Sequence, residues 1–423
     1  MTSLALVPDS GLVVHTLPIT FEPNLLALLP EGNSVAWVQG LIGQQSGAIG
    51  WGELERQEFQ GPERFSRAQK WWHTWCEQNS GNQALAFTSF AFSSNPGASV
   101  VIIPEVIVRN VGAKTLLTVI TERENLDQKI KEAIAELERN KNRRAKLPEI
   151  TWQEGSRSVS DWQLMVEGAV TRIQNGELDK VVLARDIFAH ALEAIDLGLL
   201  MMRLNQLFPD CWTFNVAGLV GATPELLLKR DGTSVTSRVL AGTVKRSSDV
   251  DYDDALAAAL LDSSKDQEEH EYAVASVRAA LAPHCTDLTI PETPTVLQLA
   301  NVQHLATDIT GQLAENVSAL TLAASLHPTA AVCGTPTERA LTLILELEGM
   351  DRGRYAGPIG WISSDGNGEL GIALRCANVE NDDRTRLRLF AGCGIVSEST
   401  GEMEVAESNA KFNAMRAALQ NES

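Results

Sequence analysis

Two ionisable residues stand where a charge is costly. Lys180 opens the apolar run Lys180–Ala189, which alternates like a strand and places the lysine on an apolar face. Desolvation there favours the neutral amine, which is a usable base. Glu225 directly precedes Leu226–Leu228, and burial equips a carboxyl to donate a proton. Two alternatives are an ion pair between these residues and a lysine that reaches solvent.

Two acidic pairs have the spacing of helix neighbours. Glu404, Glu407 and Lys411 stand at i, i+3 and i+7, and Asp266 and Glu269 at i and i+3, so each set projects from one helix face. If the two sets met, they would repel unless a cation joined them. Carboxylate oxygens and few protein ligands suit Mg²⁺, which often bridges to an anionic substrate. Each set is also typical of a solvated acidic face.

An arginine and a glycine-rich segment could receive an anion. Leu370–Val379 predicts one continuous strand, in which Arg375 is flanked on its own face by small residues. A guanidinium with open space beside it suits a carboxylate, although it could equally pair with a structural acid. Downstream, Ala391–Gly394 predicts a turn whose backbone N–H groups approach a ligand closely.

The elements that must position these residues mix antiparallel strands with helices. Residues 1–150 are predicted to form a strand-rich half that ends in a charged helix, and 151–423 to form the region that carries the chemistry. Hairpin turns are expected at 231–232, 363–368 and 381–383. Helical patterns fall at 251–262, 265–282, 336–347 and 402–419. Without a regular βαβ rhythm, this order predicts an α+β fold with a large sheet.

Composition narrows the classes of partner. The 423 residues carry 35 Lys and Arg against 54 Asp and Glu, a net charge of −19, which disfavours nucleic acid and anionic membranes. An anionic ligand would therefore need local cations. No apolar run reaches membrane-spanning length, and Met1–Leu12 lacks the pattern of a secretory signal. Six scattered cysteines without a CxxC pair fit a reduced cytoplasm.

Nine motifs also occur together in one order between about residues 155 and 415. They are LDKVVLAR (178–185), ATPELLL (222–228), LAGT (240–243), DQEEH (266–270), VQHL (302–305), LHPTAAVCGTP (326–336), ALRCA (373–377), AGCGIV (391–396) and the helix with Glu404, Glu407, Ser408 and Lys411. The combination resembles the chorismate-utilising enzymes, and among them most closely the isochorismate synthases. The resemblance implies a single large α+β domain of the anthranilate synthase type, with antiparallel sheets flanked by helices.

The resemblance also implies roles for individual residues. Lys180 matches a general base that activates water for attack at ring C2 of chorismate, and Glu225 a general acid that protonates the departing C4 hydroxyl. Glu269 and Glu407 match Mg²⁺ ligands, supported by Asp266 and Glu404, and the metal would hold the ring carboxylate. The positions that match substrate-binding residues are Gly242, Thr243, His304, Ala331, Tyr355, Arg375, Gly392 and Lys411.

Other activities of the same family must be distinguished from isochorismate synthesis. Ammonia-using relatives carry a glutamine-type residue in place of Lys180, and some carry a nucleophilic lysine in place of Ala241. Salicylate synthases keep the lysine, but they tend to have threonine where this chain has Ala331. The expectation is therefore an isomerase that acts as a monomer without an amidotransferase subunit. Salicylate synthase is the alternative, and a chorismate-binding subunit or an inactive homologue are the other classes.

Overall fold

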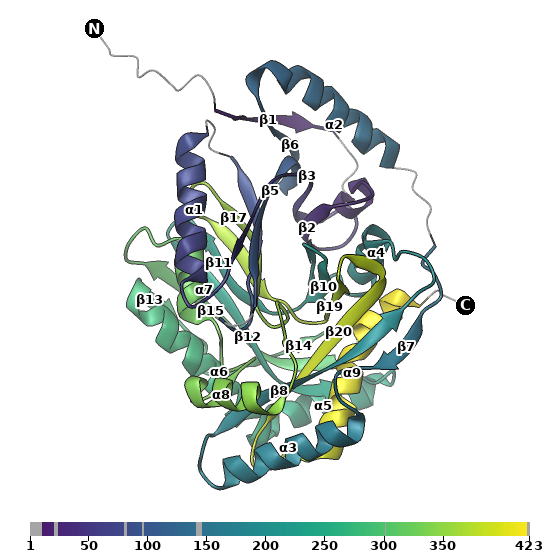
Figure 1. Cartoon of the computed structure of the whole chain (residues 1–423). Coiled ribbons are helices and arrows are strands. Elements are labelled where there is room, and N and C mark those ends of the chain that lie inside the picture. Colours follow the sequence, from purple (N-terminus) through teal and green to yellow (C-terminus); the bar gives the residue numbers. More distant parts are fainter. Residues whose placement is uncertain are drawn as a thin grey trace.

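The computed structural model describes residues 11–20, 24–79, 83–94, 97–140, 146–300 and 302–420. The first ten residues, on which most of the expectation about a secretory signal rests, lie outside the described residues. Within these ranges the chain forms strands and helices throughout its length (Figure 1). The strands are β1 Val13–Ile19, β2 Ser34–Gln39, β3 Ser46–Phe59, β4 Leu85–Ser89, β5 Ser99–Val111, β6 Lys114–Thr121, β7 Thr151–Glu154, β8 Lys180–His190, β9 Trp212–Val216, β10 Leu219–Thr223, β11 Leu226–Asp231, β12 Ser234–Lys245, β13 Cys285–Thr289, β14 Thr295–Gln298, β15 Val302–Leu313, β16 Gly334–Thr335, β17 Pro358–Ser363, β18 Gly368–Ile372, β19 Cys376–Glu380 and β20 Asp383–Ile395.

The helices are α1 Arg64–Gln78, α2 Leu126–Asn140, α3 Val159–Gln174, α4 Leu197–Leu207, α5 Val250–Asp262, α6 Ser264–Leu281, α7 Ala319–Leu326, α8 Thr337–Leu347 and α9 Gly401–Leu419. Helices α2, α5, α6, α8 and α9 occupy the segments predicted above to be helical, and α3 contains an apolar stripe of helical period, Trp162, Val166, Ala169, Val170 and Ile173. No helix is predicted over α1, α4 or α7. The chain is thus an α+β fold with antiparallel sheet, as the sequence predicts.

Strand pairing joins the two halves of the chain. The recorded pairings are all antiparallel, and β2 pairs with β9 while β4 pairs with β17, so N-terminal strands are built into the same sheet as the strands that follow residue 150. From β9 the ladder continues through β10, β19 and β20 to β8. The sheet is therefore continuous from the N-terminal half to the strand that begins with Lys180.

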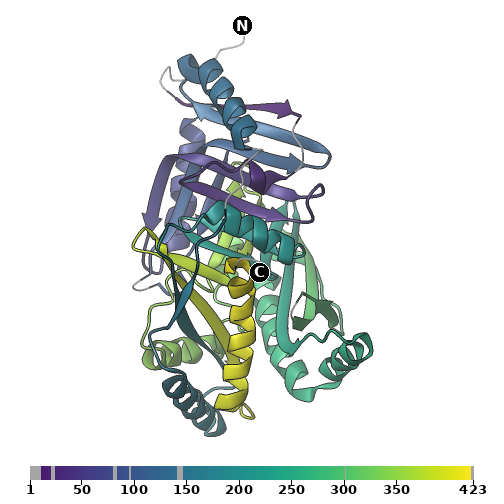
Figure 2. The ribbon, with the colours of Figure 1, turned by 90° about the vertical axis from the view of Figure 1, so that its right-hand side faces the viewer.

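Helices cover the sheet on several sides. In Figure 2, the yellow α9 runs down the middle of the lower half, and the green α5 and α6 lie to its right. α9 packs on β20, and α6 packs on β12 and β15. Residues of both helices are buried in the core, including Phe412 of α9 and Ala273 of α6. These two helices carry the two predicted acidic pairs.

The two acidic helices begin where capping residues fix them. The Ser263 side chain accepts a hydrogen bond from the Asp266 N–H at the start of α6, and Thr400 does the same for Met403 at the start of α9. Asp266 and Glu404 therefore lie in first turns, where the helix dipole favours negative charge.

Two predictions about local structure are wrong. The strand expected over Leu370–Val379 is interrupted between β18 and β19, and Arg375 lies in that interruption with a φ of 48°. Its side chain is therefore not one of an alternating strand face. The segment Ala391–Gly394 is not a turn, because it lies within β20 and pairs with Leu183, Ala184 and their neighbours on β8.

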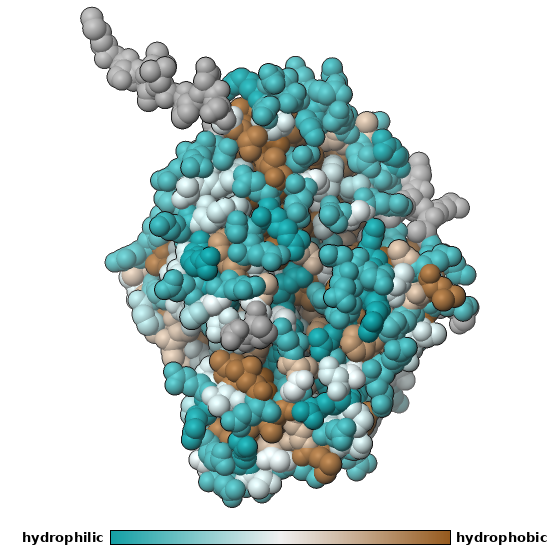
Figure 3. Space-filling view, in the orientation of Figure 1, coloured by the Kyte–Doolittle hydropathy of each residue, from teal (hydrophilic) through white to brown (hydrophobic). Residues whose placement is uncertain are grey.

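The surface shown in Figure 3 is mainly hydrophilic, with hydrophobic residues in separate patches. This distribution fits the excess of acidic residues in the sequence. In the part of the chain that the structure describes, no helix is both long and apolar enough to cross a membrane.

Candidate active site

One cavity gathers most of the predicted site residues. Its lining comes from strands, loops and helices that are far apart in the sequence. Among the residues that line it are Glu225, Gly242, Thr243, Glu269, His304, Ala331, Tyr355, Arg375, Gly392, Glu407 and Lys411. Three predicted residues, Lys180, Asp266 and Glu404, are not part of the lining surface.

Lys180 lies behind the cavity wall, paired with a lining residue. Its side chain is 0% exposed, and its Nζ is 3.0 Å from Oε1 of Glu269. Burial alone raises the pKa of Glu269, but Lys180 and other lysines outweigh burial, so the net pKa is lowered. Both earlier alternatives are therefore wrong, because Lys180 neither reaches solvent nor pairs with Glu225.

Space for this pair depends on a glycine of β20. A side chain at Gly394 would place its Cβ 2.4 Å from Oε1 of Glu269 and 3.1 Å from Cε of Lys180. Gly392 has a similar role, because a Cβ there would lie 2.9 Å from the Tyr355 hydroxyl. These glycines therefore make room for side chains, in place of the predicted presentation of N–H groups by a turn.

Glu225 and Arg375 occupy matching interruptions in neighbouring strands. β10 pairs with β19 and β11 pairs with β18, so the break at Glu225 lies opposite the break at Arg375. The Ile372 N–H donates to the carbonyl oxygen of Glu225 at 3.1 Å and helps to hold the break. The sheet opens at this point, and both residues line the cavity instead of continuing the strand alternation.

The environment of Glu225 favours its protonated form. The residue is only 4% exposed, and burial raises the pKa of its carboxyl to about 8 despite the opposing charges of Lys180, Arg375 and Lys411. A carboxyl that keeps its proton at neutral pH is suited to act as a general acid. Arg375 and Lys411, which both line the cavity, provide the local positive charge that an acidic protein needs to bind an anion.

Arg375 is held by a histidine. Its Nη2 lies 3.2 Å from Nε2 of His304, and in the described residues no carboxylate is in ion-pair contact with the guanidinium. Because a guanidinium only donates, Nε2 must accept, and the proton of the neutral ring sits on Nδ1. Nδ1 lies 3.0 Å from Oγ1 of Thr243. Burial, then Arg375 and Lys411, lower the pKa of His304 well below its usual value, so the ring stays neutral.

Thr243 reaches His304 because the β12–β15 ladder is irregular. The register shifts between Ala241 and Thr243, and Gly242, with a φ of 74°, occupies the shift. A glycine adopts this left-handed conformation without strain. The irregularity places Gly242, Thr243 and His304 together on the cavity wall, as the motif resemblance implies.

Lys411 connects α9 to β20 at the cavity. Its Nζ lies 2.6 Å from Oε1 of Glu407 and donates to the carbonyl oxygen of Gly392 at 2.7 Å. Burial lowers the pKa of Lys411, but Glu407 and Cys393 together outweigh burial, so the net pKa is raised. Lys411 is therefore a fixed positive charge on the cavity wall.

The acidic residues form a partly unneutralised group. Glu404 is 2% exposed, and burial and then Glu407 raise the pKa of its carboxyl to about 7. Burial also raises the pKa of Asp266, and the charges of Glu269 and Glu407 raise it further. Oε2 of Glu404 is buried without a hydrogen-bond partner. In the described part of the chain, ligand atoms of Glu404 and Glu407 lie within 4.8 Å of each other and of the Cys393 sulfur.

A further lining residue escaped the sequence analysis. Arg352 lies on the cavity wall and forms a buried ion pair with Glu348, four residues before it. The signal was present as an acid and a base at helical spacing in the segment Leu347–Tyr355. Such a spacing is usual on exposed helices, so the sequence does not distinguish it from a surface pair.

Comparison with known proteins shows which proteins this chain resembles. A family model described as chorismate binding enzyme matches residues 26–420. The isochorismate synthase DhbC of Bacillus subtilis is 41% identical over 271 residues, which cover 61% of this chain and 67% of that protein. The curated relative is thus matched over about two thirds of its length.

Two solved structures are similar over almost the whole chain. The menaquinone-specific isochorismate synthase MenF of Escherichia coli superposes with a TM-score of 0.80 at 26% identity, covering 97% of this chain and 95% of that one. Anthranilate synthase component I of Streptococcus pneumoniae superposes with a TM-score of 0.65 at 20% identity, over 98% of this chain and 94% of that one. The second likeness concerns the fold alone.

Proposed function

The chain belongs to the chorismate-binding enzyme family, and from this premise we propose that it is an isochorismate synthase. In the proposed isomerisation, water adds at ring C2 of chorismate and the C4 hydroxyl departs. The observation that carries the proposal is the combination of a fully buried lysine, Lys180, with a carboxyl, Glu225, whose pKa is raised to about 8. The two provide a base and an acid in one site.

The proton transfers balance over the two residues. Lys180, as the neutral amine, takes a proton from water while the water oxygen bonds to C2. Both ring double bonds shift by one position, from C1=C2 to C1=C6 and from C5=C6 to C4=C5, as the C4–oxygen bond breaks. Glu225 gives its proton to the departing hydroxyl, which leaves as water. Because one water enters and one leaves, the reaction is an isomerisation, and in the reverse direction the two residues exchange roles.

The remaining cavity residues bind and orient the substrate. We propose that Arg375 and Lys411, beside Gly392, hold the enolpyruvyl arm, because both are fixed cations on the wall. His304, Gly242, Thr243 and Tyr355 line the ring pocket. Ala331, also in the lining, is the position at which the sequence favours isochorismate over salicylate synthesis.

We also propose that Glu269 and Glu407 hold Mg²⁺, with Asp266 and Glu404 in support. The unpartnered, buried Oε2 of Glu404 supports this proposal. So do the raised pKa values of Glu404 and Asp266, which burial and then the neighbouring carboxylates cause. Hard carboxylate oxygens are the ligands that Mg²⁺ prefers. When bound, the ion would neutralise these carboxylates and hold the ring carboxylate of chorismate.

We propose that the protein works as a monomer in the cytoplasm, without an amidotransferase subunit. Every residue assigned above belongs to one chain, so the cavity needs no second copy to complete it. The six cysteines are all unpaired, which fits a reducing compartment.

The proposed function is tested by resolving the products of purified protein, chorismate and Mg²⁺ by chromatography. Isochorismate as the main product is expected. Salicylate with pyruvate would establish the alternative, a salicylate synthase, and consumption of chorismate only in the presence of ammonia would point to an amidotransferase partner.

The pH dependence should report the proton on Glu225. In the direction from chorismate, kcat is expected to fall as the pH rises through about 8, because the carboxyl then loses the proton that it must donate. In the direction from isochorismate, Glu225 acts as the base, so the same titration should raise kcat. The measurement is kcat as a function of pH, determined separately in each direction. Profiles that fall together above pH 8 would contradict the assignment.

Replacing Arg375 by alanine should mainly weaken substrate capture. A charged hydrogen bond is worth about 1.5–3 kcal/mol, so KM for chorismate should rise about 10- to 100-fold. Arg238→Ala is the matched control, because Arg238 pairs with Asp308 at 2.7 Å and does not line the cavity. An unchanged KM in Arg375→Ala, measured by steady-state kinetics, would remove the arginine from the binding site.

A further inference from the structure

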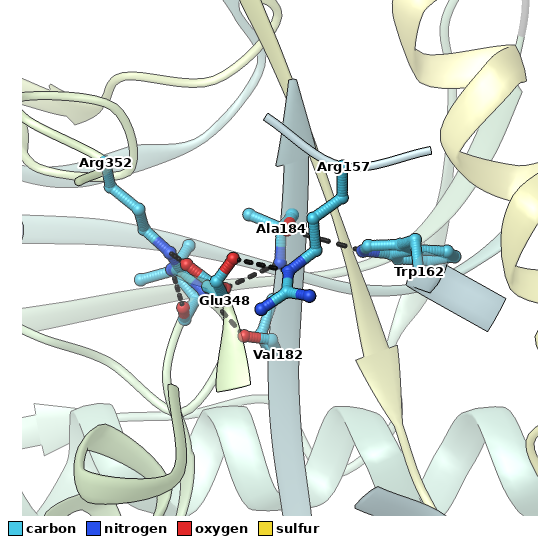
Figure 4. Close-up of polar contacts among 7 residues, drawn as sticks. Arg157, Trp162, Val182, Ala184, Glu348 and Arg352 are labelled. Carbon is cyan, nitrogen blue, oxygen red and sulfur yellow. Dashed lines mark hydrogen bonds and ion pairs between the residues drawn. The ribbon is translucent and has the colours of Figure 1, made fainter. Parts of the chain in front are cut away.

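We propose that the buried Glu348–Arg352 pair is a positioning device that holds β8, and with it Lys180, in register with the opposite wall of the cavity. The inference rests on the proposed function, because it assigns the pair a part in placing the proposed base. Neither residue is among those matched to a catalytic or binding role above. Figure 4 shows the pair beside β8, together with Arg157 and Trp162.

The pair lies where β8 lacks a neighbouring strand. One edge of β8 pairs with β20 from Val181 to His190. The other edge pairs with β16 at Lys180 and Val181 and with β7 only from Ile187 onward. The backbone groups of Val182 and Ala184 on this edge therefore face a gap in the sheet.

Side chains fill this gap in place of a strand. Glu348 Oε1 accepts from the Ala184 N–H at 2.7 Å, and Arg352 Nη2 donates to the Val182 carbonyl oxygen at 2.7 Å. Trp162 Nε1 donates to the Ala184 carbonyl oxygen at 3.3 Å, and the Val182 N–H donates to the Cys333 carbonyl oxygen at 2.8 Å. All four groups are thus satisfied, two of them by the ion pair.

The same arginine holds a second wall. Arg352 Nη1 donates to the Val332 carbonyl oxygen at 3.0 Å, and Val332 and the adjacent Ala331 line the cavity. Arg352 therefore links β8 to the loop that carries the position separating isochorismate from salicylate synthases. The backbone that follows Arg352 leads to Tyr355, which lines the cavity as well. Arg352 therefore connects three parts of the cavity wall, which are β8, the segment with Ala331 and Val332, and the segment that leads to Tyr355.

The pair itself is fixed from outside. Arg352 Nη2 and Glu348 Oε1 are 2.5 Å apart, with side-chain exposures of 3% and 1%. Arg157 donates to the carbonyl oxygens of Leu347 and Glu348 at 2.7 and 2.8 Å, which caps the C-terminal end of α8. Since Glu348 neutralises Arg352, the arginine does not offer a free charge to the substrate. Its contacts are those of a structural link that ends two residues from Lys180.

The test uses two variants. One is the double variant Glu348→Leu/Arg352→Met, and the other is the single variant Arg352→Lys. A catalytic group displaced by about 1 Å can lose about 10²-fold in rate, so kcat of the double variant should fall by that order while KM for chorismate stays near the wild-type value. KM should stay unchanged because the proposed substrate-binding residues Arg375, Lys411 and His304 do not lie on β8. Arg352→Lys keeps the charge but not the fork to both carbonyls, and it should show a smaller fall in kcat.

Two controls separate positioning from general destabilisation. Glu346→Gln removes an exposed partner of Arg172 at the end of the same helix, and Leu204→Ala opens the core at α4, away from the cavity. Both should keep wild-type kcat. Hydrogen exchange of the ligand-free protein provides a readout without substrate, in which the Ala184 amide should exchange faster in the two pair variants alone.

The outcomes are decisive in each case. Wild-type kcat in the double variant, a loss carried by KM, or unchanged exchange at Ala184 would overturn the positioning role. If the double variant does not fold, Arg352→Lys decides by the same criteria. Failure of wild-type protein to form isochorismate would instead refute the proposed function, whereas the exchange data would still judge the structural link.

Discussion

Alanine in place of Lys180 is expected to lower kcat by about 10²–10⁴-fold in both directions, the usual contribution of a general acid or base. Glu225→Gln should lose activity to a similar extent, because an amide keeps the shape of the carboxyl but has no acidic proton to transfer to the departing hydroxyl. Both variants should still bind chorismate, since the proposed anion contacts come from Arg375 and Lys411. Steady-state kinetics together with calorimetric titration of chorismate measure the two effects separately.

A matched lysine provides the control for this experiment. Lys229 pairs with Glu369 at 3.1 Å, its side chain is 50% exposed, and it does not line the cavity, so Lys229→Ala should keep wild-type turnover. Near-native turnover of Lys180→Ala would mean that water is activated by another group. The assignment of the base, and with it the proposed mechanism, would then fail.

Removal of divalent metal is expected to abolish turnover, and Mg²⁺ is expected to restore it. The physical reason is the cluster of carboxylates around Glu407, in which Glu404 has a buried oxygen without a partner and a pKa raised to about 7. Without a cation, these groups oppose an anionic substrate. Activity is measured after treatment with EDTA and dialysis, with and without added Mg²⁺.

The control for metal removal is a potassium salt at the same ionic strength, which should not restore activity. Glu407→Gln should raise the Mg²⁺ concentration needed for half-maximal activity, because it removes one of the two proposed ligands. Full turnover of the metal-free protein would contradict the metal site and leave the acid–base pair unaffected.

Much of the arrangement could be predicted from sequence because helical periodicity and turn residues are local signals. The helices that carry Asp266, Glu269, Glu404 and Glu407 were expected within two residues of their observed ends. Hairpin turns at 231–232 and 363–368 likewise separate strands that pair in the structure. The roles of the site residues came from the family resemblance that the ordered motifs carry, and not from composition or periodicity.

Features that depend on tertiary packing could not be predicted in this way. The alternation of small and large residues around Arg375 indicates a regular strand, but the opposed breaks at Glu225 and Arg375 arise from how two strand pairs meet. The glycines at 392 and 394 indicate a turn, whereas they make room within β20 for side chains from other elements. Glu348 and Arg352 resemble a surface pair until the gap beside β8 is known.

The most direct test of the central claim follows the oxygen atom. Purified protein is supplied with chorismate and Mg²⁺ in water enriched in the heavy oxygen isotope, and the product is analysed by mass spectrometry. If Lys180 activates water for attack at C2, the isochorismate formed should carry one heavy oxygen, located on its C2 hydroxyl. Isochorismate without the label would mean that the hydroxyl migrates within the substrate, and would contradict the mechanism proposed for this site.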